Sequence, residues 1–154
     1  GQVEIVTESD NQQNIENETP RINLSKSDNG ENDEDFFIDY RLERDKVRSE
    51  EINRYREMIN SPNYGESIKN KAQEKMLELT EKMEKEMKIE SLIRARGYRD
   101  ALAYIHENSV DVIVQKNGLS EKDVKIIGDI IVKTTGLDFE DVTIIEKKEK
   151  NNNE

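Results

Sequence analysis

The sequence predicts an α+β fold in two layers, with the elements in the order α-α-β-β-α-β. Three observations point to it. Apolar residues recur at helical spacing before Gly97, they alternate with period two between 101 and 115, and a capped helix precedes a last apolar run at 142–145. The crossover around the third helix should be right-handed, so the strands flanking it run parallel. The result is a three-stranded sheet that keeps two edges.

A long helical hairpin is predicted for the first half of the domain. A thin apolar stripe runs over 36–60, and the turn sequence SPNYG at 61–65 ends it. A second stripe runs over 66–96, which at about 1.5 Å per residue makes a helix of roughly 45 Å. Because this helix is longer than the sheet it covers, the two helices should pair antiparallel. Gly97 stands where a left-handed helix cap is expected.

A β-hairpin follows, with strands at 101–105 and 110–115 and a turn at 107–109. On one face it is small and aliphatic, and this face is expected to pack on the helices together with Val142 and Ile144. The opposite face should carry Leu102, Tyr104, Ile113 and Ile145. Unless the first helix folds over it, this second set forms an exposed apolar patch, and such patches mark binding surfaces.

The third helix should begin at Ser120. Asp123, three residues later, completes a capping box, and Gly136 ends the helix. Residues 138–141 turn the chain into the third strand at 142–145. Helix and strand therefore supply the remaining cover and the last strand of the sheet.

Composition divides the chain into three parts. The 154 residues carry a net charge of -11, and residues 1–35 hold ten Asp or Glu against Arg21 and Lys26. A segment this acidic and poor in aromatics buries too little apolar surface to offset its ordering entropy. We therefore expect a disordered acidic linker at 1–35, the folded domain at 36–148 and a disordered tail at 149–154. The acidic balance argues against nucleic acid and anionic lipid as partners.

Residue types that carry chemistry are scarce. Cysteine is absent and His106 is the only histidine, so a transition-metal site would need an unusual ligand set. His106 is expected to be a solvated strand residue. No Gly-rich phosphate loop occurs, and the helical carboxylates have Lys and Arg neighbours at i+3 and i+4, which is typical of solvated faces. The sequence predicts no catalytic residues, no cofactor, no metal and no small-molecule substrate, and therefore no enzyme.

The order helix–RARGYRDALAYIHENSVDVIVQK–helix–strand, after a Lys/Glu-rich helix pair that opens FFIDYRLERDKVRSEE, resembles the stage III sporulation protein AH family of endospore-forming bacteria. The C-terminal part of that family is similar to the ring-building domain of type III secretion inner-ring lipoproteins and of the flagellar M-ring protein. The resemblance covers 36–148 and rests on element order and on the phrases GYRDALA and VDVIV.

The resemblance implies a partner and a location. The partner is stage II sporulation protein Q, a LytM-fold protein of the forespore membrane, and the pair forms an intercellular channel or zipper. Self-association into a ring and contact with other stage III sporulation membrane proteins are also implied. The location is the space between mother cell and forespore, below a mother-cell membrane helix. Gly1 in place of Met suggests that such an anchor lies upstream.

Two alternatives compete with this interpretation. A free-standing coiled-coil scaffold would use the first two helices and predicts dimers that persist without 97–145. A K-homology-like module shares the α-β-β-α-β elements, but the GXXG loop and a basic face are missing. We expect the partner to bind the sheet and its adjoining edge, and the expected contact residues are Tyr98, Leu102, Tyr104, Ile113 and Ile145. A competing role for Tyr98 is to pack the helix-to-strand corner.

Overall fold

The computed structural model describes residues 4–7 and 33–149. Its helices and strands, in chain order, are β1 (Glu4–Thr7), α1 (Asp33–Asn60), α2 (Glu66–Ala95), β2 (Ala101–Ile105), β3 (Val110–Gln115), α3 (Glu121–Thr135), the short 3-10 helix η3 (Phe139–Asp141) and β4 (Val142–Lys147). Every predicted helix and strand is present, and the α+β fold class is confirmed.

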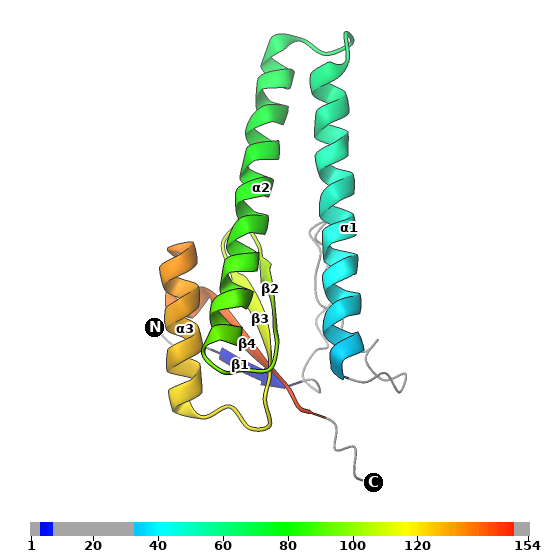
Figure 1. Ribbon diagram of the computed structural model, residues 1–154. Helices are drawn as coiled ribbons and strands as arrows, with labels where there is room; N and C mark the ends of the chain where they lie inside the picture. The colour runs from blue at the N-terminus through cyan, green and yellow to red at the C-terminus, as the bar shows by residue number, and fades with distance from the viewer. Residues whose placement is uncertain (1–3, 8–32, 150–154) are drawn as a thin grey trace.

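The helical hairpin dominates the shape of the molecule. In Figure 1 α1 and α2 run side by side and antiparallel, and their joined end projects well beyond the sheet. The lower part of α2 and α3 lie on one side of the sheet, whereas the start of α1 lies on the other. Among the described residues, no helix has the length and apolar character needed to cross a membrane.

The face of the sheet toward α2 and α3 forms the main core. The small aliphatic residues predicted for this face are all buried there, and their helical partners are Ile89 and Ile93 of α2 with Ile127 and Ile131 of α3. Alanines at 101 and 103 allow α2 to approach the strand closely. The pairing of β2 with β3 is antiparallel and that of β3 with β4 is parallel, as the crossover rule predicts.

Capping residues define the helix ends where the sequence places them. Ser120 Oγ accepts a hydrogen bond from the Asp123 backbone N–H, and the Asp123 carboxylate accepts one from the Ser120 N–H, so the capping box is confirmed. Gly136 ends α3 in the left-handed region. Gly97, directly after the α2 cap, has φ +99°, a conformation that residues with a Cβ rarely adopt.

Substituting Gly97 with alanine should lower the free energy of unfolding by about 1 kcal/mol. A Cβ at Gly97 would meet no atom within 4 Å, so backbone strain alone should set the cost. Chemical denaturation measures it. Gly65, the N-cap of α2, has ordinary extended backbone and equally open surroundings, so Gly65→Ala is the control without backbone strain. Its cost should be smaller, because the weaker cap is partly offset by the lower entropy of the unfolded chain. An unchanged midpoint for Gly97→Ala would contradict the assigned cap.

The sheet has one strand more than the sequence predicted. The strand order is β1-β4-β3-β2, and β1 pairs parallel with β4. The expectation of a disordered linker over 1–35 is therefore wrong at Glu4–Thr7, and α1 begins two residues before its end. Ile5, Val6 and Thr7 are β-branched and favour a strand, which the composition of the whole segment concealed. The rest of that prediction, at 1–3 and 8–32, and the tail at 150–154 lie outside the described residues.

Candidate partner-binding site

The face of the sheet away from α2 was expected to be exposed, and it is not. Leu102, Tyr104, Ile113 and Ile145 do share that face, as predicted, but each is at most 8% exposed. Three aromatic residues in the first two turns of α1, namely Phe36, Phe37 and Tyr40, cover them. The four residues share the predicted face, and the alternative left open by the sequence, that the first helix folds over them, is what the structure shows. Their predicted role in partner binding stays a prediction, and in this conformation α1 occupies the surface.

Tyr104 is a core residue of this second cluster. Its hydroxyl donates to the backbone oxygen of Tyr40 at 3.2 Å, and the Arg44 guanidinium lies 5.8 Å from its ring centre. Burial raises the pKa of the Tyr104 phenol well above its usual value. The phenol is therefore neutral, and its contribution is to packing rather than to an exposed anchor.

Tyr98 is the one expected contact residue that keeps part of its surface accessible. Its hydroxyl donates to the Asp123 carboxylate, and Lys116 Nζ lies 5.5 Å from its ring centre. A shallow groove beside it is lined by four cationic side chains, namely Arg96, Arg99, Lys116 and Lys122, and by two carboxylates. Asp123 pairs with Lys116 and Glu149 with Arg99, so the groove keeps an excess of positive charge. Burial, followed by the bond to Asp123, raises the pKa of Tyr98 to about 12. Tyr98 therefore both packs the corner, as the competing interpretation held, and borders a basic groove.

Asp123 ties this corner together. Burial works against the charged form of Asp123, but hydrogen bonds from Lys116, Tyr98 and Ser120 outweigh it and hold its pKa well below the ordinary 3.8. The Lys116 ammonium lies 2.7 Å from the carboxylate. The Asp123 side chain thus caps α3. It also links α3 to Lys116, directly after β3, and to Tyr98, in the connection between α2 and β2.

The depressed pKa of Asp123 predicts acid sensitivity. Because the folded state binds the proton more weakly than the unfolded state, the stability supplied by this group is present above pH 3.8 and is lost as the pH falls below it. Urea denaturation between pH 7 and pH 2 should therefore show a steeper acid loss for the native chain than for Asp123→Asn. Asp129→Asn, an exposed α3 substitution, should reproduce the native slope. Identical slopes for all three proteins would contradict the assigned network.

A buried ionic cluster, which the sequence analysis missed, lies between α1 and α2. Arg44 Nη1 is 2.7 Å from Glu90 Oε2, and Arg48 Nη1 is 2.7 Å from Glu86 Oε1. All four side chains are at most 5% exposed. Burial raises the pKa of Glu86, which the nearby Arg48 and Arg44 only partly offset. For Arg44 the reverse holds, since the attraction of Glu90 and Glu86 outweighs burial and raises its pKa.

These charged side chains hydrogen-bond the outer edge of β2. Ala101, Ala103 and Ile105 turn their backbone polar groups away from β3 because the intervening residues make the ladder bonds. Five of the six outward groups have a side-chain partner. The N–H groups of Ala101, Ala103 and Ile105 donate to the carboxylates of Asp100, Glu90 and Glu86, respectively. The backbone oxygens of Ala101 and Ala103 accept from Arg41 and Arg44, respectively.

Helix and strand geometry make this match possible. Glu86 and Glu90 are four residues apart on α2, which is about 6 Å along a helix. Ile105 and Ala103 are two residues apart on a strand, which is about 6.6 Å. Two carboxylates on successive turns can therefore meet two successive outward N–H groups. The prediction that the sheet keeps two open edges is consequently wrong at β2, where helix side chains replace a neighbouring strand.

The sequence contained a signal for this cluster. Arg44 and Arg48 continue the spacing of the apolar stripe from Tyr40 at steps of four, and Glu90 lies three residues before the buried Ile93. Charged residues at core positions of both helices indicate a buried ionic contact. The prediction that the helical carboxylates lie on solvated faces is therefore wrong for Glu86 and Glu90.

His106 was expected to be a solvated strand residue, and this prediction is wrong. It is 6% exposed, and its Nε2 lies 3.0 Å from the Asp111 carboxylate. A carboxylate only accepts, so Nε2 is the donor. His106 Nδ1 has no hydrogen-bond partner among the residues that the structure describes. The short turn after β2 brings the two side chains together. His106 borders an open groove that is also lined by Arg48, Tyr55, Leu79, Lys82 and Leu137.

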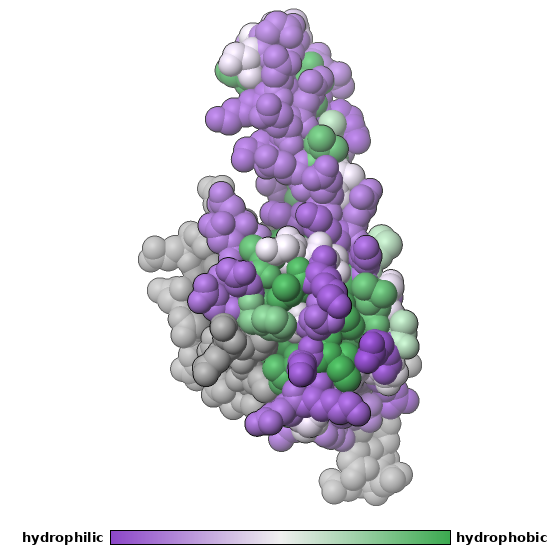
Figure 2. All heavy atoms as spheres, turned by 90° about the vertical axis from the view of Figure 1, so that its left-hand side faces the viewer, coloured by the Kyte–Doolittle hydropathy of each residue, from purple (hydrophilic) through white to green (hydrophobic). Residues whose placement is uncertain are grey.

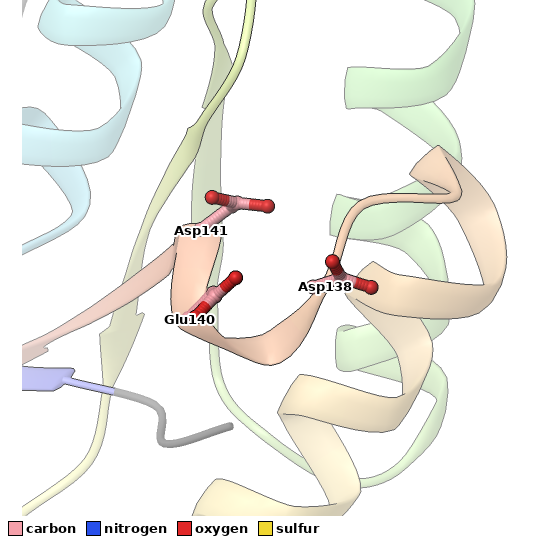
Figure 3. Close-up of side chains that lie close together, drawn as sticks. All are labelled: Asp138, Glu140 and Asp141. Atoms are coloured by element: carbon pink, nitrogen blue, oxygen red, sulfur yellow. The ribbon is translucent and has the colours of Figure 1, made fainter.

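Three carboxylates gather between α3 and β4. Figure 3 shows Asp138, Glu140 and Asp141, which lie on η3 and at the residue before it. One oxygen from each carboxylate lies within 4.8 Å of the other two. Asp138 and Glu140 are exposed. Water can solvate such groups without a cation, and within the described chain no buried ligand joins them.

The surface on the side of α3 is mixed. Figure 2 shows apolar side chains gathered over the sheet domain, interrupted by charged ones, while the projecting hairpin is hydrophilic. Apolar residues that pack on the core while keeping some exposure are Tyr98, Leu119, Val124, Ile130, Val132 and Leu137. Outside the covered face, this side of the domain therefore offers apolar surface to a partner.

Comparison with known proteins places this architecture. The model of the family described as SpoIIIAH-like protein matches residues 2–144. The chain belongs to the SpoIIIAH-like protein family. This membership confirms the family resemblance predicted from the sequence, and with it the non-enzymatic class.

Two relatives carry the comparison further. Stage III sporulation protein AH of Bacillus subtilis (strain 168) is 30% identical over 101 residues, which are 66% of this chain and 46% of that protein. The chain thus matches about half the length of this curated relative. A chain in the solved SpoIIQ–SpoIIIAH pore forming complex is 26% identical with a TM-score of 0.67, covering 74% of this chain and 98% of that one.

Proposed function

We propose that this chain is a non-enzymatic, partner-binding domain of a sporulation complex, and that its partner is stage II sporulation protein Q. The observation that carries the proposal is the structural match to nearly the whole of a chain from the SpoIIQ–SpoIIIAH pore forming complex. The largest buried ionic cluster in the described residues, formed by Arg44, Arg48, Glu86 and Glu90, binds the β2 edge and joins the two long helices, which is a structural role.

The family also supports a location and an assembly. In this proposal the domain lies between mother cell and forespore, held by a mother-cell membrane anchor, and the pair forms an intercellular channel or zipper. Self-association into a ring and contact with other stage III sporulation membrane proteins belong to the same proposal. The face of the projecting hairpin seen in Figure 2 is mostly hydrophilic, which suits a domain exposed to water.

The basic groove beside Tyr98 is the proposed contact region. Tyr98 offers a partly accessible ring and borders four cationic side chains. A partner with an acidic or hydrogen-bond-accepting loop would fit this groove. The other expected contact residues, Leu102, Tyr104, Ile113 and Ile145, would reach a partner only after the start of α1 moved away.

Binding to purified stage II sporulation protein Q tests both the proposed partner and the proposed contact region at Tyr98. Sedimentation should show a complex with the native chain, and Tyr98→Ala should weaken it by more than about 1.4 kcal/mol, or roughly tenfold. Tyr64→Ala removes an exposed tyrosine from the hairpin turn and is the control, which should bind normally. Absence of any complex would overturn the proposed function, whereas normal binding by a folded Tyr98→Ala chain would overturn only the site.

The coiled-coil alternative makes a different prediction in the same experiment. In the structure α1 and α2 pair within one chain, and side chains of both bind β2. A scaffold would instead sediment as a dimer held by these helices. A monomer that binds the partner would exclude it.

A further inference from the structure

We propose that the β4 edge of the sheet is a strand-addition site, and that the Glu4–Thr7 strand of a second copy of this chain can occupy it in place of the chain's own β1. The inference deepens the proposed self-association by naming the strand that joins two copies, but it does not depend on the proposed partner. The proposal rests on how the backbone groups at the two edges of the sheet are paired.

The β2 edge is closed to strands. Five of its six outward backbone groups already bind side chains of Arg41, Arg44, Glu86, Glu90 and Asp100. A strand arriving there would have to displace a buried ionic cluster and leave its charges unpaired, which is strongly unfavourable. Strand addition to this sheet is therefore confined to the other edge.

The β4 edge is held only lightly. All six residues of β4 pair with β3, but β1 pairs with four of them, Thr143 to Glu146. Figure 1 shows β1 as a short arrow beside β4, the outermost strand on that side. A four-residue strand is at the short end of those found in proteins and contributes few ladder bonds. Its replacement by another strand consequently costs little.

The β1 strand of a second copy fits the β4 edge because it repeats the pairing seen within one chain. Residues 8–32 separate β1 from α1 in sequence, so β1 belongs to no hairpin of the described domain. A second copy offers the identical Glu4–Thr7 sequence in the identical parallel register, and every pair with β4 would be preserved. Exchange of an identical element between copies is a low-cost route to association. The fraction of chains that exchange β1 should rise with protein concentration. The chain's own β1 competes for β4, but its effective concentration is fixed by the linker and does not change.

Disulfide trapping in the full chain tests the exchange. The sequence has no cysteine, so introduced thiols report only the designed contact. Glu4 and Thr143 are directly opposite in the β1–β4 register. After a Glu4→Cys chain and a Thr143→Cys chain are mixed and mildly oxidised, a mixed covalent dimer should form at several times the yield of Glu4→Cys with Lys125→Cys. Lys125 is exposed on α3 and reports random collision.

Strand pairing, as distinct from mere proximity, is checked by prolines in the donor. Backbone N–H groups alternate in direction along a strand, so replacing both Ile5 and Val6 with proline must remove one that faces β4. In the Glu4→Cys chain this change should reduce the mixed dimer to the collision level. A single chain carrying both Glu4→Cys and Thr143→Cys, without the prolines, measures the competition. If it forms only the intramolecular disulfide at every protein concentration, exchange between copies is overturned. Absence of both cross-links would overturn the strand-addition site itself.

Discussion

Glu90→Ala should lower the free energy of unfolding by about 3–5 kcal/mol. The carboxylate of Glu90 accepts hydrogen bonds from the Ala103 N–H and from Arg44, and Arg41 lies 3.4 Å from it. Its removal leaves a buried guanidinium without this partner and a buried N–H without an acceptor. Removing one member of a buried pair costs far more than the pair contributes, because the remaining charge is desolvated and uncompensated.

Two companions separate the causes of this loss. Glu90→Gln keeps an acceptor oxygen for Ala103 and should lose less than Glu90→Ala. Glu84→Ala removes an exposed carboxylate from the same helix and should stay within about 0.5 kcal/mol of the native chain. Denaturation by urea gives all three values. If Glu90→Ala behaved like Glu84→Ala, α2 would not contact the β2 edge in solution.

The same substitution bears on the assembly of the protein. A buried ionic cluster is weak evidence for added stability, since apolar side chains of similar volume often do as well. Apolar side chains could not, however, pair with the outward N–H and C=O groups of Ala101, Ala103 and Ile105. We therefore interpret the cluster as the feature that closes the β2 edge to strands. Sedimentation of Glu90→Ala at rising concentration should show more association than the native chain, because β2 then offers a second edge to strands.

Much of the fold was predictable because it depends on local signals. The period-two alternation located β2 and β3 to the residue, and Ser120 with Asp123 located the start of α3. Gly97 and Gly136 marked helix ends because only glycine adopts positive φ without strain. Such signals lie within a few residues of one another, and the chain displays them directly.

What could not be predicted depends on contacts between distant parts of the chain. Phe36 and Phe37 read as the start of a thin amphipathic stripe, and nothing near them shows that they cover Ile113, nearly 80 positions away. The pairing of β1 with β4 joins Glu4 to Thr143 across almost the whole sequence. Residue alternation gives the two faces of a strand but not what covers each face. The candidate site was therefore assigned to the correct face and to the wrong degree of exposure.

Tyr104→Ala tests that corrected assignment, and we expect it to lower the free energy of unfolding by about 3–5 kcal/mol. The ring is 2% exposed, packs with the aromatic residues of α1 and lies beneath the Arg44 guanidinium. Truncation would leave a cavity under α1 that rigid neighbouring strands cannot fill. Tyr104→Phe keeps the ring and loses only the hydrogen bond to Tyr40, so its cost should be about 1 kcal/mol.

The decisive comparison sets stability against partner affinity in the same protein. If α1 covers Tyr104 in solution, Tyr104→Ala should be much less stable, while its folded fraction binds stage II sporulation protein Q with native affinity. Tyr64→Ala, at an exposed tyrosine, should change neither quantity. The opposite result, native stability with weakened binding, would mean that α1 leaves this face in solution and that Leu102, Tyr104, Ile113 and Ile145 meet the partner directly. Because the two accounts predict opposite changes in two independent measurements, a single variant decides between them.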